Sequence, residues 1–408
     1  MRTQGDYKQT NQLLENILFI YEDSLSYECN IFEADDAILS YDENQFSRTF
    51  FLALNRFINV LGKKGCYRSA LEFNKFLVKL NPYQDPVGGL LTLDYNSISC
   101  KNFDYLMKFP NKFGKQYYKD DKYSLIYMPN YLYSVALCKF YKLTEDENVG
   151  ISQYAGVTQE DFDRALAADI DPCEQNHNVN LLQAILLYPR VIREIINVNE
   201  YSKSTLQLGG DKFTNWQKKS FKDILKHEFL DSKHEYLYPC LNLNNNNDIE
   251  GLNKVIEIYV ERSKLIWKHN KVTLWVKACL GMILNQIEQG FNYEEFIEKM
   301  FTAEFKYKVP FEMSRYKGML KSNFSDHVDR IDFANIPDVQ QGGVQNPEMQ
   351  GYNPINPNSG LLNLIFGSLL PWNHLAPSQN NQNNQNNQDD DEESLPSDVE
   401  IHDEEYYD

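Results

Sequence analysis

The 408-residue sequence has few residues that interrupt helices, no closely spaced cysteine pair and no long apolar segment. Only 15 Pro and 19 Gly are present, which excludes a collagen-like chain and argues mildly against an all-β one. The seven cysteines occur singly, without a Cys-x-x-Cys pair, so we expect free thiols in a reducing compartment, with neither a disulfide framework nor a zinc site. The first dozen residues lack the apolar core of a secretory signal. The longest apolar stretch, residues 361–372, is shorter than the roughly 20 residues that span a bilayer, so we predict no membrane partner.

Sequence motifs of common catalytic chemistry are also missing. The chain has no Gly-x-Ser-x-Gly, no phosphate-binding Gly-x-x-x-x-Gly-Lys, no His-Glu-x-x-His and no kinase motif set. His227 and His234 lie seven residues apart without a third ligand, so we predict no metal site and no cofactor. Glu72 and Asp94 each lie near an apolar stripe. A catalytic carboxylate pair stays open there beside the simpler role of hydrogen bonding between helices. We therefore predict that the protein is not an enzyme.

Negative charge is concentrated near one end of the sequence. The net charge is -18, and residues 389–408 contribute 11 Asp and Glu but no Lys or Arg, which leaves a net charge of -7 for residues 1–388. The acidic composition therefore says little against a nucleic-acid or ribosomal partner. An Asn/Gln tract, residues 379–388, precedes the acidic run. Neither segment can bury enough apolar surface to offset the entropy lost on ordering, so we predict disorder for both.

Apolar residues with helical spacing dominate the rest of the chain. The clearest unit comprises a helix near residues 50–61, a glycine turn at 62–65, and a second helix over 66–80 that Pro82 stops. A helix, a turn and a second helix form the unit of tetratricopeptide-like solenoids. Further helices are predicted over residues 13–32, 87–99, 101–109, 129–143, 178–187, 191–198, 249–269, 273–289 and 294–305, with Pro110 ending the third and loops at 144–161 and 242–247. The predicted fold is all-α, a tetratricopeptide-like helical-hairpin solenoid with a disordered acidic C-terminal tail.

The domain organisation follows from these patterns. We expect a flexible N-terminus at 1–12, a helical-repeat domain at 13–330, an extended Pro/Gly/Asn-rich segment at 331–377, and a disordered tail at 378–408. The extended segment contains an apolar island that can be a last core helix or a docking helix for a partner groove. Its candidate partner-binding residues are Leu369, Leu370 and Trp372.

Two stretches combine lysines with aromatic residues. One runs from Lys101 to Lys122 and includes Lys108 and Lys112, interspersed with three aspartates. Such residues can bind RNA through phosphate contacts and stacking, although a solvated surface is the simpler interpretation. The second stretch supplies the candidate partner-binding residues Lys212, Trp216, Lys218, Lys219 and Lys222.

Several blocks of the sequence resemble the transcription factor 25 family, also called nuclear localised protein 1. The blocks are residues 50–54, 65–73, 80–86, 91–95, 128–137, 259–267, 351–354 and 366–371. Within residues 80–86 we also expect Asp85 to cap a helix that begins at Pro86. The residues that match the family motif, in structural roles, are Phe51, Leu54, Gly65, Cys66, Arg68, Ala70, Leu71, Glu72, Asp85, Pro86, Asp94 and Trp267.

The resemblance implies a function that the residue patterns do not reach. Fungal members of the family are subunit 1 of the ribosome quality control complex. The resemblance therefore implies a non-enzymatic adaptor that acts with a ring-finger ubiquitin ligase on stalled large ribosomal subunits, so that the nascent chain is degraded. Ubiquitin, a segregase and ribosomal RNA are further implied partners, and the implied location is cytoplasmic, with a nuclear one also open. The alternative is a nuclear transcriptional repressor that acts through protein–protein contacts.

One feature of the sequence departs from the family pattern. Members usually have a long Lys- and Arg-rich region ahead of the part that matches Leu13, whereas here Met1 lies only a dozen residues upstream. The chain is either a fragment or a member without this basic region. If the region is lacking, contacts that depend on it are in doubt.

Overall fold

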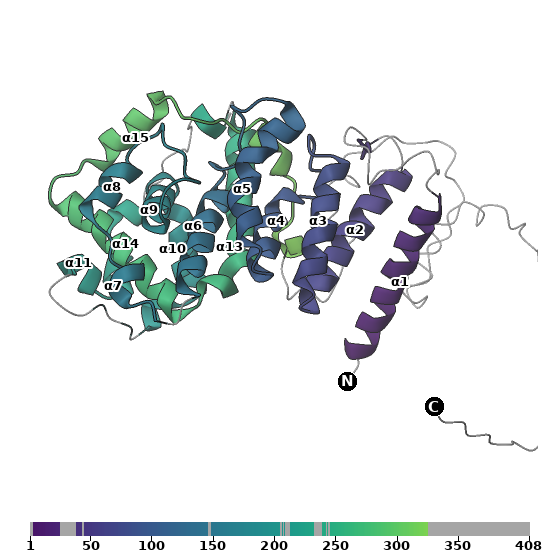
Figure 1. Ribbon diagram of the computed structural model, residues 1–408, viewed down its shortest axis with the longest axis horizontal. Coiled ribbons are helices and arrows are strands. Elements are labelled where there is room, and N and C mark those ends of the chain that lie inside the picture. Colours follow the sequence, from purple (N-terminus) through teal and green to yellow (C-terminus); the bar gives the residue numbers. More distant parts are fainter. Residues whose placement is uncertain are drawn as a thin grey trace, which may run out of the picture. The chain divides into compact units, whose positions relative to one another are not determined.

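The regular structure of the chain is helical throughout the part that the computed structural model describes. The described residues are 3–24, 38–42, 45–145, 148–204, 206, 208, 213–231, 239–241, 243 and 245–324. Within them, the β-structure is a single isolated bridge between Tyr123 and Lys308 (Figure 1). The all-α prediction is confirmed for these residues. The segments 331–377 and 378–408, with Leu369, Leu370 and Trp372, lie outside them.

Four helices at one end of the described part pack in chain order. They are α1 (Thr3–Ser24), α2 (Gln45–Lys63), α3 (Tyr67–Leu80) and α4 (Leu90–Ser99), and each contacts the next. Figure 1 shows α1, α2 and α3 side by side. The helix–turn–helix unit predicted near residues 50–80 is thus confirmed. The predicted start of the first helix at Leu13 is wrong, because α1 already begins at Thr3 within the segment expected to be flexible. Polar residues extend a helix once it is nucleated, since each adds a backbone hydrogen bond, and apolar spacing does not detect them.

The helix that follows is not ended by its proline. α5 (Phe103–Phe113) continues past Pro110 into the π-helix η1 (Gly114–Tyr118). A proline inside a helix removes one hydrogen bond and crowds the preceding turn. Here Phe109 and Phe113, on either side of Pro110, are buried, and the Pro110 carbonyl accepts a hydrogen bond from the Leu125 amide at 3.1 Å. Tertiary packing on both sides of the proline therefore outweighs the local penalty.

The middle of the described part contains α6 (Pro129–Thr144), α9 (His177–Leu187) and α10 (Pro189–Val198). Proline occupies the first turn of α6 and α10, where its missing N–H costs nothing. The polar segment predicted as a loop at 144–161 contains α7 (Ile151–Tyr154) and the start of α8 (Gln159–Ala165). The Thr158 hydroxyl and the Asp161 carboxylate cap α8 reciprocally, a signal that the polar composition concealed.

The last part of the described chain folds back onto earlier helices. It contains α11 (Asn215–Lys218), α12 (Phe221–Ile224), α13 (Asn246–Trp267), α14 (Asn270–Glu288) and α15 (Tyr293–Thr302). α13 begins inside the loop predicted at 242–247, because the Asn245 side chain caps its first turn. α13 contacts α4, α6 and α10, and the turns η5 (Met313–Tyr316) and η6 (Lys321–Phe324) pack on it. In a simple solenoid each repeat contacts only its neighbours along the chain. The contacts of α13 with helices far from it in the sequence do not fit that pattern. A tetratricopeptide-like solenoid stays a prediction.

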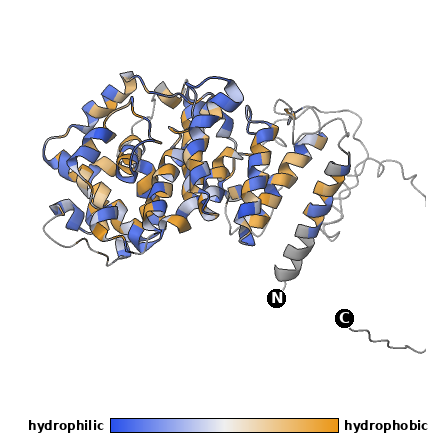
Figure 2. Ribbon diagram, viewed as in Figure 1, coloured by the Kyte–Doolittle hydropathy of each residue, from blue (hydrophilic) through white to orange (hydrophobic). Residues whose placement is uncertain are grey.

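Large aromatic side chains form the centre of the core. The rings of Phe140 and Trp275 stack with their centroids 4.4 Å apart, and Trp267 lies parallel to Trp275 at 6.4 Å. Figure 2 shows hydrophobic and hydrophilic residues on the same helices, as expected for helices with one buried face. None of the described helices is long and apolar enough to cross a bilayer.

Candidate functional site

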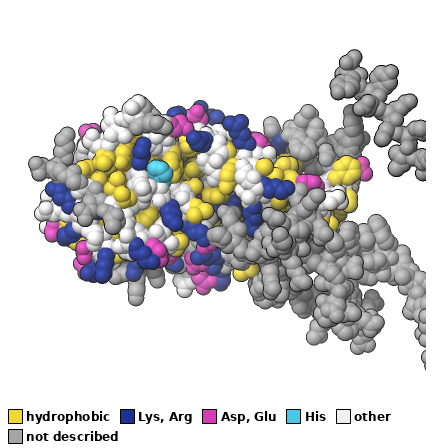
Figure 3. All heavy atoms as spheres, turned by 90° about the horizontal axis from the view of Figure 1, so that it is seen from below, with side chains coloured by type: hydrophobic (Ala, Val, Ile, Leu, Met, Phe, Trp, Pro, Cys, Tyr) yellow, Lys and Arg dark blue, Asp and Glu magenta, His cyan; other side chains and the backbone are white. Residues whose placement is uncertain are grey.

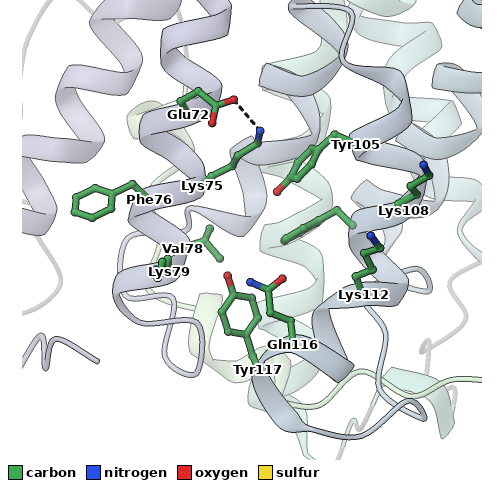
Figure 4. A pocket seen from close by; sticks show the side chains of 11 residues that line it. Glu72, Lys75, Phe76, Val78, Lys79, Tyr105, Lys108, Lys112, Gln116 and Tyr117 are labelled. Atoms are coloured by element: carbon green, nitrogen blue, oxygen red, sulfur yellow. Dashed lines mark hydrogen bonds and ion pairs between the residues drawn. The ribbon is translucent and has the colours of Figure 1, made fainter. Parts of the chain in front are cut away.

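A groove between two N-terminal helices gathers charged and aromatic side chains (Figure 4). It has a volume of about 490 Å³ and is lined by α3, α5 and η1. The amphipathic pattern of α3 and α5 turns their apolar residues into the core and leaves lysines at the rim. We call it the α3–α5 groove, and its lining residues are Glu72, Lys75, Phe76, Val78, Lys79, Tyr105, Lys108, Phe109, Lys112, Gln116 and Tyr117.

Positive charge prevails at the rim of the α3–α5 groove. Four of its lining residues are lysines and one is a glutamate, although the chain as a whole is acidic. Lys75 forms an ion pair with Glu72, with 2.7 Å between Nζ and Oε1. Lys108 and Lys112 are exposed, and neither forms an ion pair with a described residue. The groove is therefore suited to an anionic ligand.

The aromatic rings in the groove pack against neighbouring rings, and one of them also contacts a lysine. Tyr105 stacks on Phe109 with 5.3 Å between centroids, and the Lys75 ammonium lies 4.2 Å above the Tyr105 ring. Burial raises the pKa of Tyr105 far above its ordinary value, so this hydroxyl stays protonated. Tyr117 packs against Phe113 at 5.0 Å. These contacts hold the Tyr105 and Tyr117 rings against their neighbours.

The second lysine stretch lies on and between two short helices, α11 and α12. Lys219 lies 3.2 Å above the Trp216 ring, and the His227 ring packs against Trp216 at 5.4 Å. Lys218 and Lys222 are exposed on α11 and α12. Lys212 lies outside the described residues. The Trp216 ring is thus in contact with Lys219 and His227, and a role of these residues in partner binding stays a prediction.

One acidic residue of the family motif, Asp94, is buried between helices. The Ser134 hydroxyl donates to Asp94 at 2.8 Å, and burial raises the pKa of Asp94 to about 7. The Trp267 indole N–H donates to the hydroxyl of Tyr259, which lies 3.4 Å from the Ser134 hydroxyl. Asp94 and Trp267 therefore belong to one polar network between α4, α6 and α13. Glu72 is instead exposed in the α3–α5 groove, so the two carboxylates do not share a site.

Asp85 caps a helix in a way that the sequence did not predict. α4 begins at Leu90 rather than Pro86, and Asp85 lies in the preceding loop with a φ of 45°. Its two carboxylate oxygens lie 3.3 Å and 3.2 Å from the Leu90 amide, which donates to them, and the Tyr316 hydroxyl donates at 3.1 Å. The predicted N-cap with Pro86 in the first turn is wrong, because residues 85–89 form turns that bring the carboxylate back over the helix start. Asp85 thereby joins α4 to η5.

The other motif residues lie either in the core or at the turn between α2 and α3. Phe51, Leu54, Ala70 and Leu71 are buried between α2, α3 and α4. Gly65 has a φ of +76°, which ends α2 in the left-handed region that favours glycine. The motif also includes exposed residues at the α2–α3 turn, namely Cys66 and Arg68. Packing accounts for the buried motif residues, whereas these exposed ones remain available for contact with a partner.

The described residues show no arrangement typical of a metal site. No group of three His, Cys, Asp or Glu side chains is positioned to hold a metal ion among them. Six described cysteines are free thiols. Figure 3 shows Lys and Arg side chains at several separate places on one face of the described part, with hydrophobic atoms between them.

Sequence reasoning found only part of the α3–α5 groove. The α3–α5 groove takes Lys108 and Lys112 from the stretch that we had judged an ordinary surface. It also contains Lys75 and Lys79, which no interpretation had singled out. The available signal was spacing, since each pair is separated by four residues and so lies on one face of a helix. Which two helices face each other is tertiary information that spacing does not carry.

Comparison with known proteins identifies the family. A family model described as "Transcriptional repressor TCF25" matches residues 1–356. Among curated proteins, the chain is similar to "Ribosome quality control complex subunit TCF25" of Mus musculus, with 22% identity over 71% of this chain and 35% of that protein. The Dictyostelium discoideum protein of the same name is 21% identical over 86% of the chain and 42% of its own length. "Ribosome quality control complex subunit 1" of Saccharomyces cerevisiae is 33% identical over 26% of the chain and 15% of its length.

The matches cover different shares of this chain and of its relatives. The chain spans less than half the length of these relatives. No solved structure matches it. The family model nevertheless covers most of the sequence, from Met1 through every described helix. The chain therefore belongs to the family described as transcriptional repressor TCF25.

Proposed function

We propose that the protein is a non-enzymatic adaptor of the ribosome quality control complex. The observation that carries this proposal is the family match over residues 1–356, since relatives from a mammal, an amoeba and a yeast are all named as subunits of that complex. In this role the chain joins stalled large ribosomal subunits and acts there beside a ring-finger ubiquitin ligase. Ubiquitin and a segregase complete the expected partners, ribosomal RNA is a further one, and the location is the cytoplasm.

The described part offers surfaces suited to such a scaffold. The α3–α5 groove is open and basic, and the exposed Cys66 and Arg68 lie at the turn that begins α3. The lysines at 218, 219 and 222 and the apolar residues at 369, 370 and 372 are further proposed contacts. An adaptor needs several separate contact surfaces, whereas an enzyme needs reactive groups that converge in one cleft.

Affinity purification from cells with stalled translation tests this proposal. The full chain is expected to recover large-subunit proteins and a ring-finger ligase, and recovery should rise when translation is stalled. A variant that ends at residue 330 separates contacts of the helical part from those of residues 331–408. Recovery of neither large-subunit proteins nor ligase with the full chain would show that the adaptor role is wrong.

A nuclear transcriptional repressor is the second candidate function. The description of the family model supports it directly. The chain would then act through protein–protein contacts, because its sequence has no recognised DNA-reading motif. Chromatin association of the chain, with corepressor proteins and without ribosomal ones, would favour this role over the first.

A further inference from the structure

The α3–α5 groove presents its positive charge in two rows. Lys75 and Lys79 lie on α3, and Lys108 and Lys112 lie on α5 at the other side of the groove (Figure 4). Residues four apart on a helix are separated by about 6 Å along its axis. The rows therefore place two lysines on each wall at a similar spacing, and the Lys75 ammonium also pairs with Glu72.

An extended acidic polypeptide fits this spacing. Successive side chains of an extended chain point to opposite sides, and those on one side repeat every 6.6 Å or so. A run of consecutive carboxylates would thus direct alternate residues to the α3 wall and the α5 wall. Lysine ammonium groups are compact charges that suit single carboxylates.

Single-stranded RNA fits the groove less well. Proteins that bind single strands add stacking on open aromatic rings to their phosphate contacts. In the groove, the Tyr105 ring packs against Phe109 and lies under the Lys75 ammonium. This ring therefore already has partners for stacking and for cation contact, which favours an acidic peptide over a nucleic-acid strand.

The chain itself contains such a peptide within reach. Residues 389–393 are five consecutive carboxylates, and residues 389–408 contain no Lys or Arg. The described part ends at Phe324, which packs against Gly88 in the loop that follows α3. The intervening residues number 64. A chain of that length can span at most roughly 210 Å, about ten times the length of α3, so its length does not keep residues 389–393 from the groove.

We propose that the α3–α5 groove binds acidic polypeptide, and that residues 389–393 of the same chain occupy it. The segment belongs to the same chain, so its binding to the groove is intramolecular. A ligand that reaches the groove from outside must displace it. The interaction is electrostatic and weakens as salt shortens the screening length.

Zero-length cross-linking of the full chain tests the intramolecular contact. A carbodiimide joins a carboxylate directly to an ammonium, and mass spectrometry of the monomer locates the joined residues. We expect links from residues 389–393 to the four groove lysines at least tenfold more abundant than links to the exposed Lys218 and Lys222, and a loss of this preference at high salt. Equal labelling of both lysine sets, or links between molecules only, would overturn the proposal.

Binding of a labelled peptide with the sequence of residues 389–408 gives a second, independent measurement. A full-chain variant in which Asp389, Asp390 and Asp391 become Asn and Glu392 and Glu393 become Gln should bind the peptide about tenfold more tightly than the natural sequence, because the competing segment is neutral. In that background, Lys108→Gln with Lys112→Gln should weaken binding at least tenfold, while Lys218→Gln with Lys222→Gln should not. Polyuridylate that binds through Lys108 and Lys112 and resists the peptide would show that RNA is the ligand instead. These measurements need no ribosome, so their failure would leave the proposed adaptor role untouched.

Discussion

The side-chain carboxyl group of Asp94 is partly protonated at neutral pH because it is buried. Its pKa of about 7 exceeds the ordinary value near 3.8. A raised pKa means that the folded state binds a proton more tightly than the unfolded state. The stability from this proton is fully present below pH 4 and is lost as pH rises to about 7. The contribution of the Asp94 network to the free energy of unfolding should therefore fall as the pH rises across that range.

Replacement of Asp94 by Asn removes this titration and keeps the acceptor for Ser134. We expect the unfolding free energy of Asp94→Asn, relative to the natural sequence, to rise between pH 5 and pH 8 by up to about 3 kcal/mol. Urea unfolding at both pH values measures it. Asp104→Asn is the control, because the pKa of the exposed Asp104 is lowered by Lys142 and both pH values lie above its titration. The same relative stability of Asp94→Asn at both pH values would refute the assigned protonation.

Gly65 illustrates a motif residue whose role lies in the backbone. Its φ of +76° costs a residue with a side chain about 1–2 kcal/mol, although the space around it is open. We expect Gly65→Ala to lower the unfolding free energy by that amount. Gly62→Ala, at a helical site with only an ordinary contact to Tyr67 at 3.9 Å, should be neutral or stabilising by up to about 1 kcal/mol. Thermal unfolding compares the two, and equal effects would contradict this account.

At the scale of elements, the contact between α13 and the segment after α15 locks the described part together. A Cβ atom on Gly251 would lie 1.9 Å from the Met313 carbonyl oxygen, so the helix and η5 touch through their backbones. Arg262, also on α13, donates to the Asn59 side chain at 3.0 Å and to the Phe324 carbonyl at 3.3 Å. The end of the described chain is thereby tied to α2.

Gly251→Ala should therefore separate η5 from α13. We expect a loss of about 3 kcal/mol in unfolding free energy, together with faster hydrogen exchange in residues 304–324. Gly150→Ala, where an added Cβ meets nothing within 4 Å, should change the stability by less than about 0.5 kcal/mol. Unchanged exchange in residues 304–324 would mean that this segment does not depend on the close contact.

Elements with strong apolar spacing could be predicted from the sequence, and those held by tertiary contacts could not. The helices around residues 50–80 were found because their buried faces repeat every three or four residues. α8 was missed because its signal is a polar cap, and Pro110 was misjudged because local propensity was overruled by the burial of Phe109 and Phe113. The sequence indicated the groove lysines Lys108 and Lys112, but their position opposite α3 is known only from the fold.

At the scale of the whole molecule, charge is divided between two parts of one chain. A helical part with a basic groove is followed by a strongly acidic segment, so the net charge of -18 describes neither. The comparisons add that relatives of this chain are named as subunits of a ribosome quality control complex. The central claim is that the chain works as an adaptor on the stalled large subunit.

Sedimentation of the full chain through a sucrose gradient tests this claim most directly. Lysates from cells with and without a stalled reporter message are compared for the amount of chain in the large-subunit fractions. The account predicts that stalling moves the chain into those fractions. A chain that stays near the top of the gradient in both lysates, while the ubiquitin ligase moves into the large-subunit fractions, would contradict it.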